Sequence, residues 1–340
     1  MKRRTRRTLI VVAAVLVFLA VAVFLRSKAP PEAARLLPES DGIVYVNFKP
    51  IHTFFKKDLK PPDHVPEYQQ FIDATGIDWE RDLDAAAIGI DRMQDPNGPN
   101  GPAAYSMILA GKLTGPKLRA WLEKNAASRE NYSGHTIYSI PSDGRTVRVA
   151  QIGYDMVAIS NFPTTEKIHS IVDHHRTAAW PLSNSTLLSR YYHEVPLLSI
   201  AWGVGQIGSP FNEDGAINIL GLQLPIQSDS TIVASVAPEL PLGGALRVRV
   251  EEIAPSDDAA ASQATALSTV VTLARGFTEP LSDNPANRGL KALIKTAEVT
   301  QTRNRVVIKA RLAPSFFQSL ASQKNNSEDQ TTPSGAPASQ

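Results

Sequence analysis

Short runs of apolar and β-branched residues along the chain alternate with longer segments of helical periodicity. Runs bounded by Gly, Pro, Asn and Asp are typical of strands. We therefore expect strands at 42–48, 86–90, 104–113, 136–140, 146–152, 156–160, 197–204, 231–237, 245–251 and 302–312. Residues 42–48 are apolar on both faces, which predicts a strand in the middle of a sheet. Gly153-Tyr154-Asp155 predicts a hairpin between the two strands that flank it.

The segments between these strands predict helices with one apolar face. We expect them at 65–75, from Pro116, at 163–176, 187–194, 256–276 and 285–297. Gly76 is a candidate left-handed cap after the first of these helices. Ser256 caps the longest one, which should end at Gly276, with Ala260, Ala264, Leu267, Val271 and Ala274 as its buried stripe.

This order of elements predicts an α+β fold. We expect two related units of mainly antiparallel sheet with packed helices, at residues 36–178 and 179–322. Residues 26–35 are expected to form a short Pro-containing linker before them. The tail 323–340 has no large apolar residue and is expected to be disordered.

The N-terminal pattern predicts a single transmembrane helix before the two units. Residues 1–8 form a basic stub, and Leu9 to Leu25 is an unbroken run of seventeen apolar residues. A cleaved signal peptide is the alternative, but Pro30 follows the small-x-small candidate Ser27-Lys28-Ala29 and disfavours cleavage. Five basic residues precede the run, so the positive-inside rule places the N-terminus in the cytoplasm. The body is then expected outside it, in the periplasm of a cell with two membranes.

Composition narrows the class of protein. The chain has 340 residues, 43% of them apolar and 20% charged, with no cysteine and a net charge of +2. These values exclude a disordered chain, a disulfide-stapled miniprotein and a multi-pass membrane protein. Residues 1–28 hold seven basic residues and no acidic one, so the body has 28 basic against 33 acidic residues. A mildly acidic body predicts no nucleic-acid partner.

Four segments of the first half carry a resemblance to a known group of proteins. They are Leu36 to Ile51, Thr75 to Ile90, Ala110 to Lys124 and Gly134 to Ile140, all after the N-terminal apolar run. In this order the chain resembles uncharacterised membrane-anchored bacterial envelope proteins of the domain-of-unknown-function type. The resemblance implies an extracytoplasmic α+β protein and transfers no catalytic residue.

Few residues suggest chemistry, and each has a structural alternative. His169, Asp173 and His174 lie on one predicted helix and are weak metal-ligand candidates; the alternative is a cationic last helical turn. Gly203, Gly205 and Gly208 match the spacing of a dinucleotide-binding loop, but turn-forming residues follow instead of a helix. We expect no cofactor and identify no catalytic residue.

Charged clusters give two further candidates. Asp78, Glu80, Asp82 and Asp84 form an acidic segment that is more typical of a solvated turn than of a calcium loop. The outward positions of two late strands are basic and form a candidate ligand or partner surface, at Arg247, Arg249, Arg303, Arg305, Lys309 and Arg311. If these strands pair, the surface could meet anionic lipid or glycan. The alternative is a solvated face with salt bridges to Glu251, Glu252 and Glu298.

Two functional hypotheses follow from the sequence. The first is a non-enzymatic, membrane-tethered binding or assembly domain of the cell envelope, anchored in the bilayer by residues 9–25. Its partner would be an envelope protein, an anionic lipid or a glycan. The alternative is an anchored hydrolase whose site is assembled from distant residues, with His135, His193 and the acidic segment as candidates.

Overall fold

The computed structural model describes residues 29–55, 66–98, 101–177, 185–206, 216–219, 222–225, 230–239, 245–277 and 285–312. The expected basic stub, transmembrane helix and C-terminal tail lie outside these residues. Among the helices that are described, none combines the length and apolar character needed to cross a membrane.

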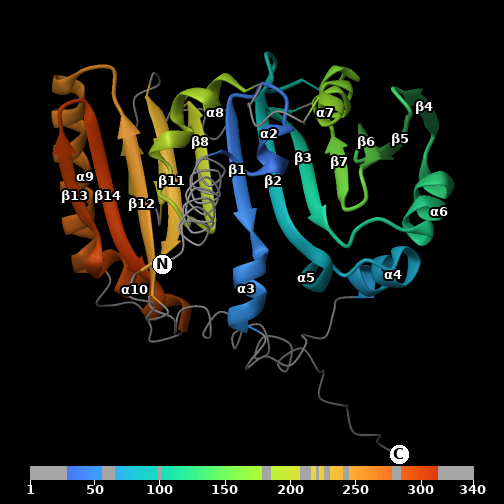
Figure 1. Ribbon diagram of the computed structural model, residues 1–340. Helices are drawn as coiled ribbons and strands as arrows, with labels where there is room; N and C mark the ends of the chain where they lie inside the picture. Colours follow the sequence, from blue (N-terminus) through green and yellow to red (C-terminus); the bar gives the residue numbers. More distant parts are fainter. Residues whose placement is uncertain are drawn as a thin grey trace, which may run out of the picture.

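The fold is α+β and is built on one twelve-stranded antiparallel sheet (Figure 1). The strands lie side by side in the order β13-β14-β12-β11-β8-β1-β2-β3-β7-β6-β5-β4, and a separate pair, β9-β10, completes the described strands. Their bounds are β1 Gly42–Asn47, β2 Leu83–Arg92, β3 Ala103–Gly111, β4 Ser128–Tyr132, β5 His135–Ser142, β6 Arg145–Ile152, β7 Met156–Ser160, β8 Ala201–Gln206, β9 Ala216–Ile219, β10 Leu222–Pro225, β11 Thr231–Pro238, β12 Leu246–Ile253, β13 Glu298–Thr302 and β14 Arg305–Leu312.

Strand β1 occupies the middle of the sheet, as its apolar residues on both faces predict. It pairs with β2 on one side and with β8 on the other, both antiparallel. The strands from residues 42–160 therefore form one contiguous block, and those of the large sheet from residues 201–312 form a second block. The β1–β8 pairing joins the two blocks into one sheet.

Helices cover parts of both faces of the sheet. Their bounds are α2 Glu32–Arg35, α3 Phe48–Phe55, α4 Pro66–Thr75, α5 Trp79–Asp82, α6 Pro116–Asn125, α7 Glu166–Thr177, α8 Thr186–Tyr191, η1 Tyr192–Glu194, α9 Asp257–Phe277 and α10 Pro285–Thr296. We call the face under α2, α7 and α8 the α7 face, and the opposite one, under α6 and α9, the α9 face.

Apolar side chains fill the space under these helices. On the α7 face, Ile168, Ile171 and Val172 of α7 share a core with residues of β1, β2, β3, β6 and β7. On the α9 face, Leu118 and Leu122 of α6 pack on β3, β5 and β7 in a second core. A third core joins α9 to β13 and β14 through Ala260, Leu267, Val299, Val306 and Ile308.

Several elements differ from their predicted bounds for local reasons. The helix after Ser256 does not end at Gly276 but includes Phe277, because Gly276 does not adopt the positive φ of a left-handed cap. Residues 196–199 make a turn before β8, with Leu198 in the left-handed region at φ 70°, so that strand starts at Ala201. The last predicted strand corresponds to β14, and β4, β9, β10 and β13 were not predicted.

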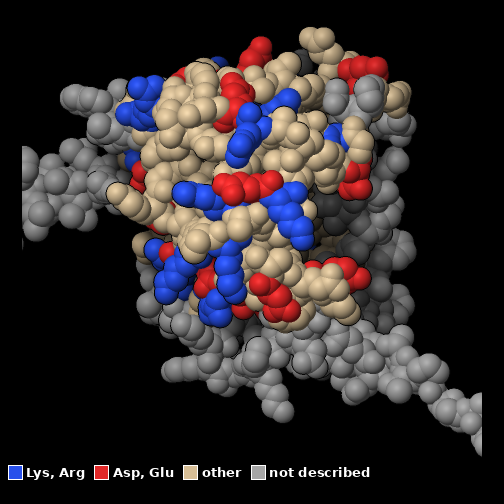
Figure 2. Space-filling model, turned by 90° about the vertical axis from the view of Figure 1, so that its right-hand side faces the viewer, with Lys and Arg blue, Asp and Glu red and all other residues tan. Residues whose placement is uncertain are grey.

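The outer edge at β4 is polar. Ser128, Arg129, Glu130 and Asn131 of this edge strand are all exposed. On the side of the molecule toward this edge, basic and acidic side chains lie close together (Figure 2). Charged residues on an edge strand oppose pairing with another chain, so this edge is protected against uncontrolled sheet extension.

Candidate functional site

A pocket on the α7 face lies where the two blocks of strands meet. Tyr45 on β1 and Trp202 on β8 are directly opposite each other in the antiparallel register. Their rings stack with centroids 5.5 Å apart, and the ring of Tyr192 meets Trp202 edge to face at 5.2 Å. We call the cavity beside these three rings the aromatic pocket.

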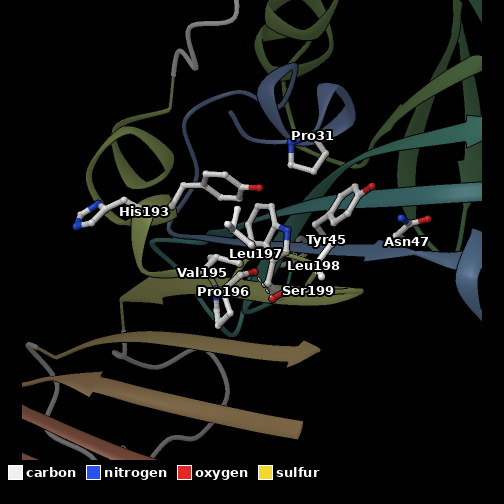
Figure 3. A pocket seen from close by; sticks show the side chains of 11 residues that line it. Pro31, Tyr45, Asn47, His193, Val195, Pro196, Leu197, Leu198 and Ser199 are labelled. Carbon is white, nitrogen blue, oxygen red and sulfur yellow. Dashed lines mark hydrogen bonds between the residues drawn. The ribbon is translucent and has the colours of Figure 1, made fainter. Parts of the chain in front are cut away.

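The aromatic pocket has a volume of about 160 Å³ and is lined by both apolar and polar side chains. Tyr45 and Asn47 lie at one end of it, Pro31 above it, and His193 at the opposite end with its ring turned outward (Figure 3). Leu197 and Leu198 belong to its lining and are 54% and 68% exposed. Two adjacent leucines that remain open to solvent at a pocket suggest contact with a ligand.

The polar atoms of the three rings are available to a ligand. Trp202 is 3% exposed and Tyr45 is 8% exposed. No residue within the described part of the chain forms a hydrogen bond with the indole Nε1 of Trp202 or with the hydroxyl of Tyr45 or Tyr192. These three atoms are not among the buried polar atoms of the described residues that lack a partner, so they are accessible from the pocket. A ligand can replace the water on them, which suits a binding site.

Burial keeps both phenols in their protonated form. Burial raises the pKa of Tyr45, and the neighbouring Tyr192 raises it further. Burial also raises the pKa of Tyr192. Each hydroxyl therefore remains a hydrogen-bond donor as well as an acceptor across the physiological pH range.

A second pocket on the α7 face holds a partly buried ion pair. Lys167 of α7 lies 2.6 Å from Oδ1 of Asp91 on β2, and its ammonium also donates to the carbonyl oxygen of Glu39. Burial raises the pKa of Asp91, although Lys167 acts in the opposite direction. The pocket has a volume of about 320 Å³. Because this ion pair connects α7 to β2, we assign Lys167 a structural role rather than a role in ligand binding.

The candidate metal ligands have separate partners. His169 stacks on Tyr132 at 3.8 Å and lies 3.1 Å from Glu130. Asp173 accepts a hydrogen bond from Tyr132, and Nδ1 of His174 lies 3.1 Å from the carbonyl oxygen of Leu36. Within the described ranges, no group of three or more His, Asp and Glu residues could hold a metal ion.

The residues of the hydrolase alternative lie far apart. His135 is on β5 and His193 on η1, which packs on β8 through Tyr192. Strands β5 and β8 are six positions apart in the sheet, or about 29 Å at 4.8 Å per strand. The structure does not bring these two histidines together.

The acidic segment is structural. Asp78 caps α5 by accepting from the backbone of Glu80, and it also accepts from the hydroxyl of Tyr68. Asp82 is held by Arg81 through two hydrogen bonds of 2.8 Å, and Asp84 pairs with Lys49. Each of these three carboxylates already has a local partner, which agrees with the turn interpretation.

Two glycines of the dinucleotide-like motif lie where β8 packs against β1. Gly203 and Gly205 lie on β8, and an added Cβ at Gly205 would come within 3.2 Å of the Gly42 Cα on β1. Gly205 therefore allows close approach of the two central strands. Gly208 lies outside the described residues.

The basic surface forms because β12 and β14 pair. Arg247 lies opposite Arg311, and Arg249 lies opposite Lys309, all on the α7 face. Like charges directly opposite each other are unfavourable, so compensating acids are expected nearby.

Acidic side chains compensate part of this surface. Arg305 bridges Glu194 and the buried Glu251 at 2.7 and 2.8 Å, Arg249 also meets Glu251, and Arg311 meets Glu239. Glu252 instead faces α9 and accepts from Ser230. Burial raises its pKa.

One member of the predicted basic surface was placed wrongly. Arg303 is not on a strand face but in the turn between β13 and β14, at φ 53°. The hairpin needs a residue in the left-handed region there, which removes Arg303 from the alternation of the strand. Among the five cations on the strand faces, Arg247 and Lys309 have no ion pair with a described residue.

The sequence did not single out the aromatic pocket. Tyr45 and Trp202 fall inside two predicted strands, but their contact depends on a pairing between distant halves of the chain. The available signal was an aromatic residue in the centre of each of two apolar strands, which is also typical of an ordinary core.

Comparisons with known proteins add a similarity of fold. No family model and no curated protein matches the chain. Among solved structures, three crystal forms of a protein named TP0453 are similar to it. Form III has 8% identity and a TM-score of 0.48, and the match covers 86% of this chain and 99% of that one. Form IV has 9% identity and a TM-score of 0.45, and the match covers 86% of this chain and 95% of that one. Form I has 9% identity and a TM-score of 0.43, and the match covers 87% of this chain and 98% of that one.

Proposed function

We propose that this protein is a non-enzymatic, membrane-tethered binding or assembly domain of the bacterial cell envelope. Residues 9–25 would cross the inner membrane once, with the N-terminus in the cytoplasm and the body in the periplasm. Its partner would be an envelope protein, an anionic lipid or a glycan, and not a nucleic acid. The proposal for the tether relies on the basic stub and the seventeen-residue apolar run that follows it.

The aromatic pocket is the observation that carries the binding role. It gathers three polar atoms without described partners and two exposed leucines where the two blocks of strands meet. The titratable residues suggested for catalysis have structural partners or lie on distant strands. A site with hydrogen-bond donors and aromatic surface but no nucleophile–base pair favours binding over catalysis.

The order of the strands supports the proposal that the body consists of two related units. Each block starts with three sequential strands of the large sheet, β1-β2-β3 in one and β8-β11-β12 in the other. In each block the chain then crosses by a helix on the α9 face, and its last strand returns beside the third one. The first block has two further strands, so the units differ in size.

A topology reporter tests the location of the body. The full chain carries β-lactamase after Gln340 and is produced in a Gram-negative bacterium. We expect ampicillin resistance, and its loss when residues 2–28 are deleted. A matched variant replaces Lys2, Arg3, Arg4, Arg6 and Arg7 with Glu and should lower resistance, because these charges orient the span.

Carbonate extraction and the length of the protein, both measured in the same cells, complete the test. The anchored form stays in the membrane after carbonate extraction and keeps its full length, whereas signal cleavage gives a shorter, extractable protein. Equal resistance with and without residues 2–28 contradicts the proposal.

A further inference from the structure

We propose that the aromatic pocket binds one sugar ring of a negatively charged polysaccharide, and that Arg247 and Lys309 hold the anionic groups of neighbouring units. This inference deepens the proposed function, since it names the ligand of a binding domain. It concerns the pocket and the adjoining part of the α7 face, and it can be tested independently of where the protein is located.

The volume of the pocket suits a single six-membered ring. A cavity of about 150 Å³ is large enough to hold benzene, and this pocket measures about 160 Å³. Aromatic rings of Tyr45, Tyr192 and Trp202 form part of its wall. A pyranose has a flat apolar C–H surface, which packs against such rings, and polar hydroxyls around its edge.

The polar atoms of the pocket suit the edge of a sugar. The indole of Trp202 can donate one hydrogen bond, and the two phenols can each donate and accept. Asn47 adds an amide to the lining. A purely apolar ligand would displace water from these groups without replacing its hydrogen bonds, which costs free energy. A polyhydroxylated ring can satisfy several of them together.

The register of the sheet places Trp202 at the pocket and the basic residues of β12 and β14 in one row across neighbouring strands. Trp202 lies opposite Ser235 on β11, Ser235 opposite Arg249 on β12, and Arg249 opposite Lys309 on β14. Residues opposite each other in antiparallel pairs share a face, so this row lies on the α7 face. At about 4.8 Å per strand, Lys309 is about 14 Å from Trp202. Ser235 in this row is only 3% exposed, so a ligand that reaches from the pocket to Lys309 has to pass above the groups that cover β11.

The charges favour an anionic ligand over a cationic one. Aromatic cages also bind quaternary ammonium groups. Here, however, the residues beyond the pocket include Arg247 and Lys309, which have no ion pair with a described residue. Their positive charge repels a cation and attracts carboxylate or phosphate. Arg249 and Arg305 are already neutralised by Glu251 and Glu194, so they add little.

The turn at the pocket has the features of a recognition loop. Leu198 adopts φ 70°, which is unfavourable for a residue with a Cβ, and remains 68% exposed. The hydroxyl of Ser199 donates to the carbonyl oxygen of Pro196 at 2.7 Å and fixes the turn (Figure 3). Strained residues persist where the surrounding structure holds them, often at binding sites.

A calorimetric titration tests the proposal on the full chain in phosphatidylcholine nanodiscs, which avoid detergents with sugar headgroups. The two probes are a hexasaccharide of alternating N-acetylglucosamine and glucuronate, and the neutral hexamer of N-acetylglucosamine. We expect the anionic hexasaccharide to bind more tightly, and its advantage to shrink at high salt. Vesicles of phosphatidylglycerol serve as the competing lipid probe.

Variants assign the binding to the site. Tyr192→Phe removes one hydroxyl and should weaken both hexamers about fivefold, the value of one hydrogen bond. Lys309→Ala and Arg247→Ala should each weaken only the anionic hexamer, about twofold to fivefold, and reduce its salt dependence. Tyr191→Phe and Lys117→Ala are the matched controls, since neither residue lines the aromatic pocket or the basic row, and both should leave binding unchanged.

Four results overturn the proposal. They are no binding of either hexamer, equal affinity for the two hexamers, binding that Tyr192→Phe does not change, and binding of phosphatidylglycerol vesicles alone. None of these results decides whether the body is extracytoplasmic, because the β-lactamase reporter measures that separately.

Discussion

Tyr45 of β1 and Trp202 of β8 face each other across the junction of the two strand blocks, with their rings stacked at 5.5 Å. The two residues are 157 positions apart in the chain. Their contact has two roles: it joins the blocks through a buried aromatic pair, and it forms part of the wall of the aromatic pocket. Stability and binding are therefore coupled at this junction.

Trp202→Ala should destabilise the protein strongly. Removing a buried Trp side chain leaves a cavity and typically costs about 3–5 kcal/mol. Urea unfolding of the full chain in nanodiscs measures the change, with Trp121→Ala as control because Trp121 is only partly buried. A loss for Trp202→Ala no larger than that for the control would show that the junction does not depend on this pair.

Arg305 should contribute more than Arg311 to the free energy of unfolding. Arg305 bridges Glu194 and Glu251, and Glu251 is 1% exposed. Arg305→Ala leaves this buried carboxylate with Arg249 alone and should lower the free energy of unfolding by about 2 kcal/mol.

Arg311→Ala breaks a more exposed pair with Glu239 and should cost less than about 1 kcal/mol. Thermal unfolding of both variants compares the two losses. Equal losses would contradict the assignment of Arg305 to a buried network.

Acidification should reveal the role of Asp82. Hydrogen bonds from Arg81 hold the pKa of Asp82 below its ordinary value. A carboxyl whose folded pKa is depressed stabilises the protein above its unfolded pKa, and this stability is lost as the pH falls through the folded pKa.

Asp82→Asn should therefore destabilise the protein by about 1 kcal/mol at pH 7, with the difference disappearing toward pH 2. Urea unfolding across this range is the measurement, and Asp84→Asn is the exposed control. A difference that grows on acidification would reverse the assigned sign.

Gly111 should tolerate no side chain. It adopts φ 153°, and an added Cβ would overlap the carbonyl oxygen of Asp82. Gly134 also has a positive φ, at 83°, but nothing lies within 4 Å of an added Cβ. We expect Gly134→Ala to cost about 1 kcal/mol from backbone strain alone and Gly111→Ala to cost clearly more. Differential scanning calorimetry compares them, and similar melting temperatures would contradict the predicted clash.

The α+β class, the central place of β1 and most element positions were predictable because local patterning determines them. The Gly76 cap is an example, since its φ of 72° and its bond to the carbonyl oxygen of Ile72 follow from local geometry. Strand order was not predictable, because the β1–β8 pairing joins segments far apart in sequence. Edge strands β4 and β13 were missed because their exposed polar residues lack the apolar alternation that identifies a strand.

The candidate site was predictable only in part. The sequence raised the pairing of the basic strands only as a condition, and the structure pairs them, with Arg247 opposite Arg311 and Arg249 opposite Lys309. The sequence did not indicate which of these cations would form ion pairs, because the partners Glu194 and Glu239 lie outside the two basic strands. The aromatic pocket requires the same long-range pairing as the sheet itself.

The most direct test of the account follows the indole of Trp202 during ligand binding. The full chain is labelled with 5-fluorotryptophan at its four Trp residues, and each ¹⁹F signal is assigned by a single Trp→Phe variant. Upon titration with the anionic hexasaccharide, we predict that the Trp202 signal shifts, while those of Trp79 and Trp121 on the α9 face stay in place. A stationary Trp202 signal at saturating hexasaccharide would contradict the account.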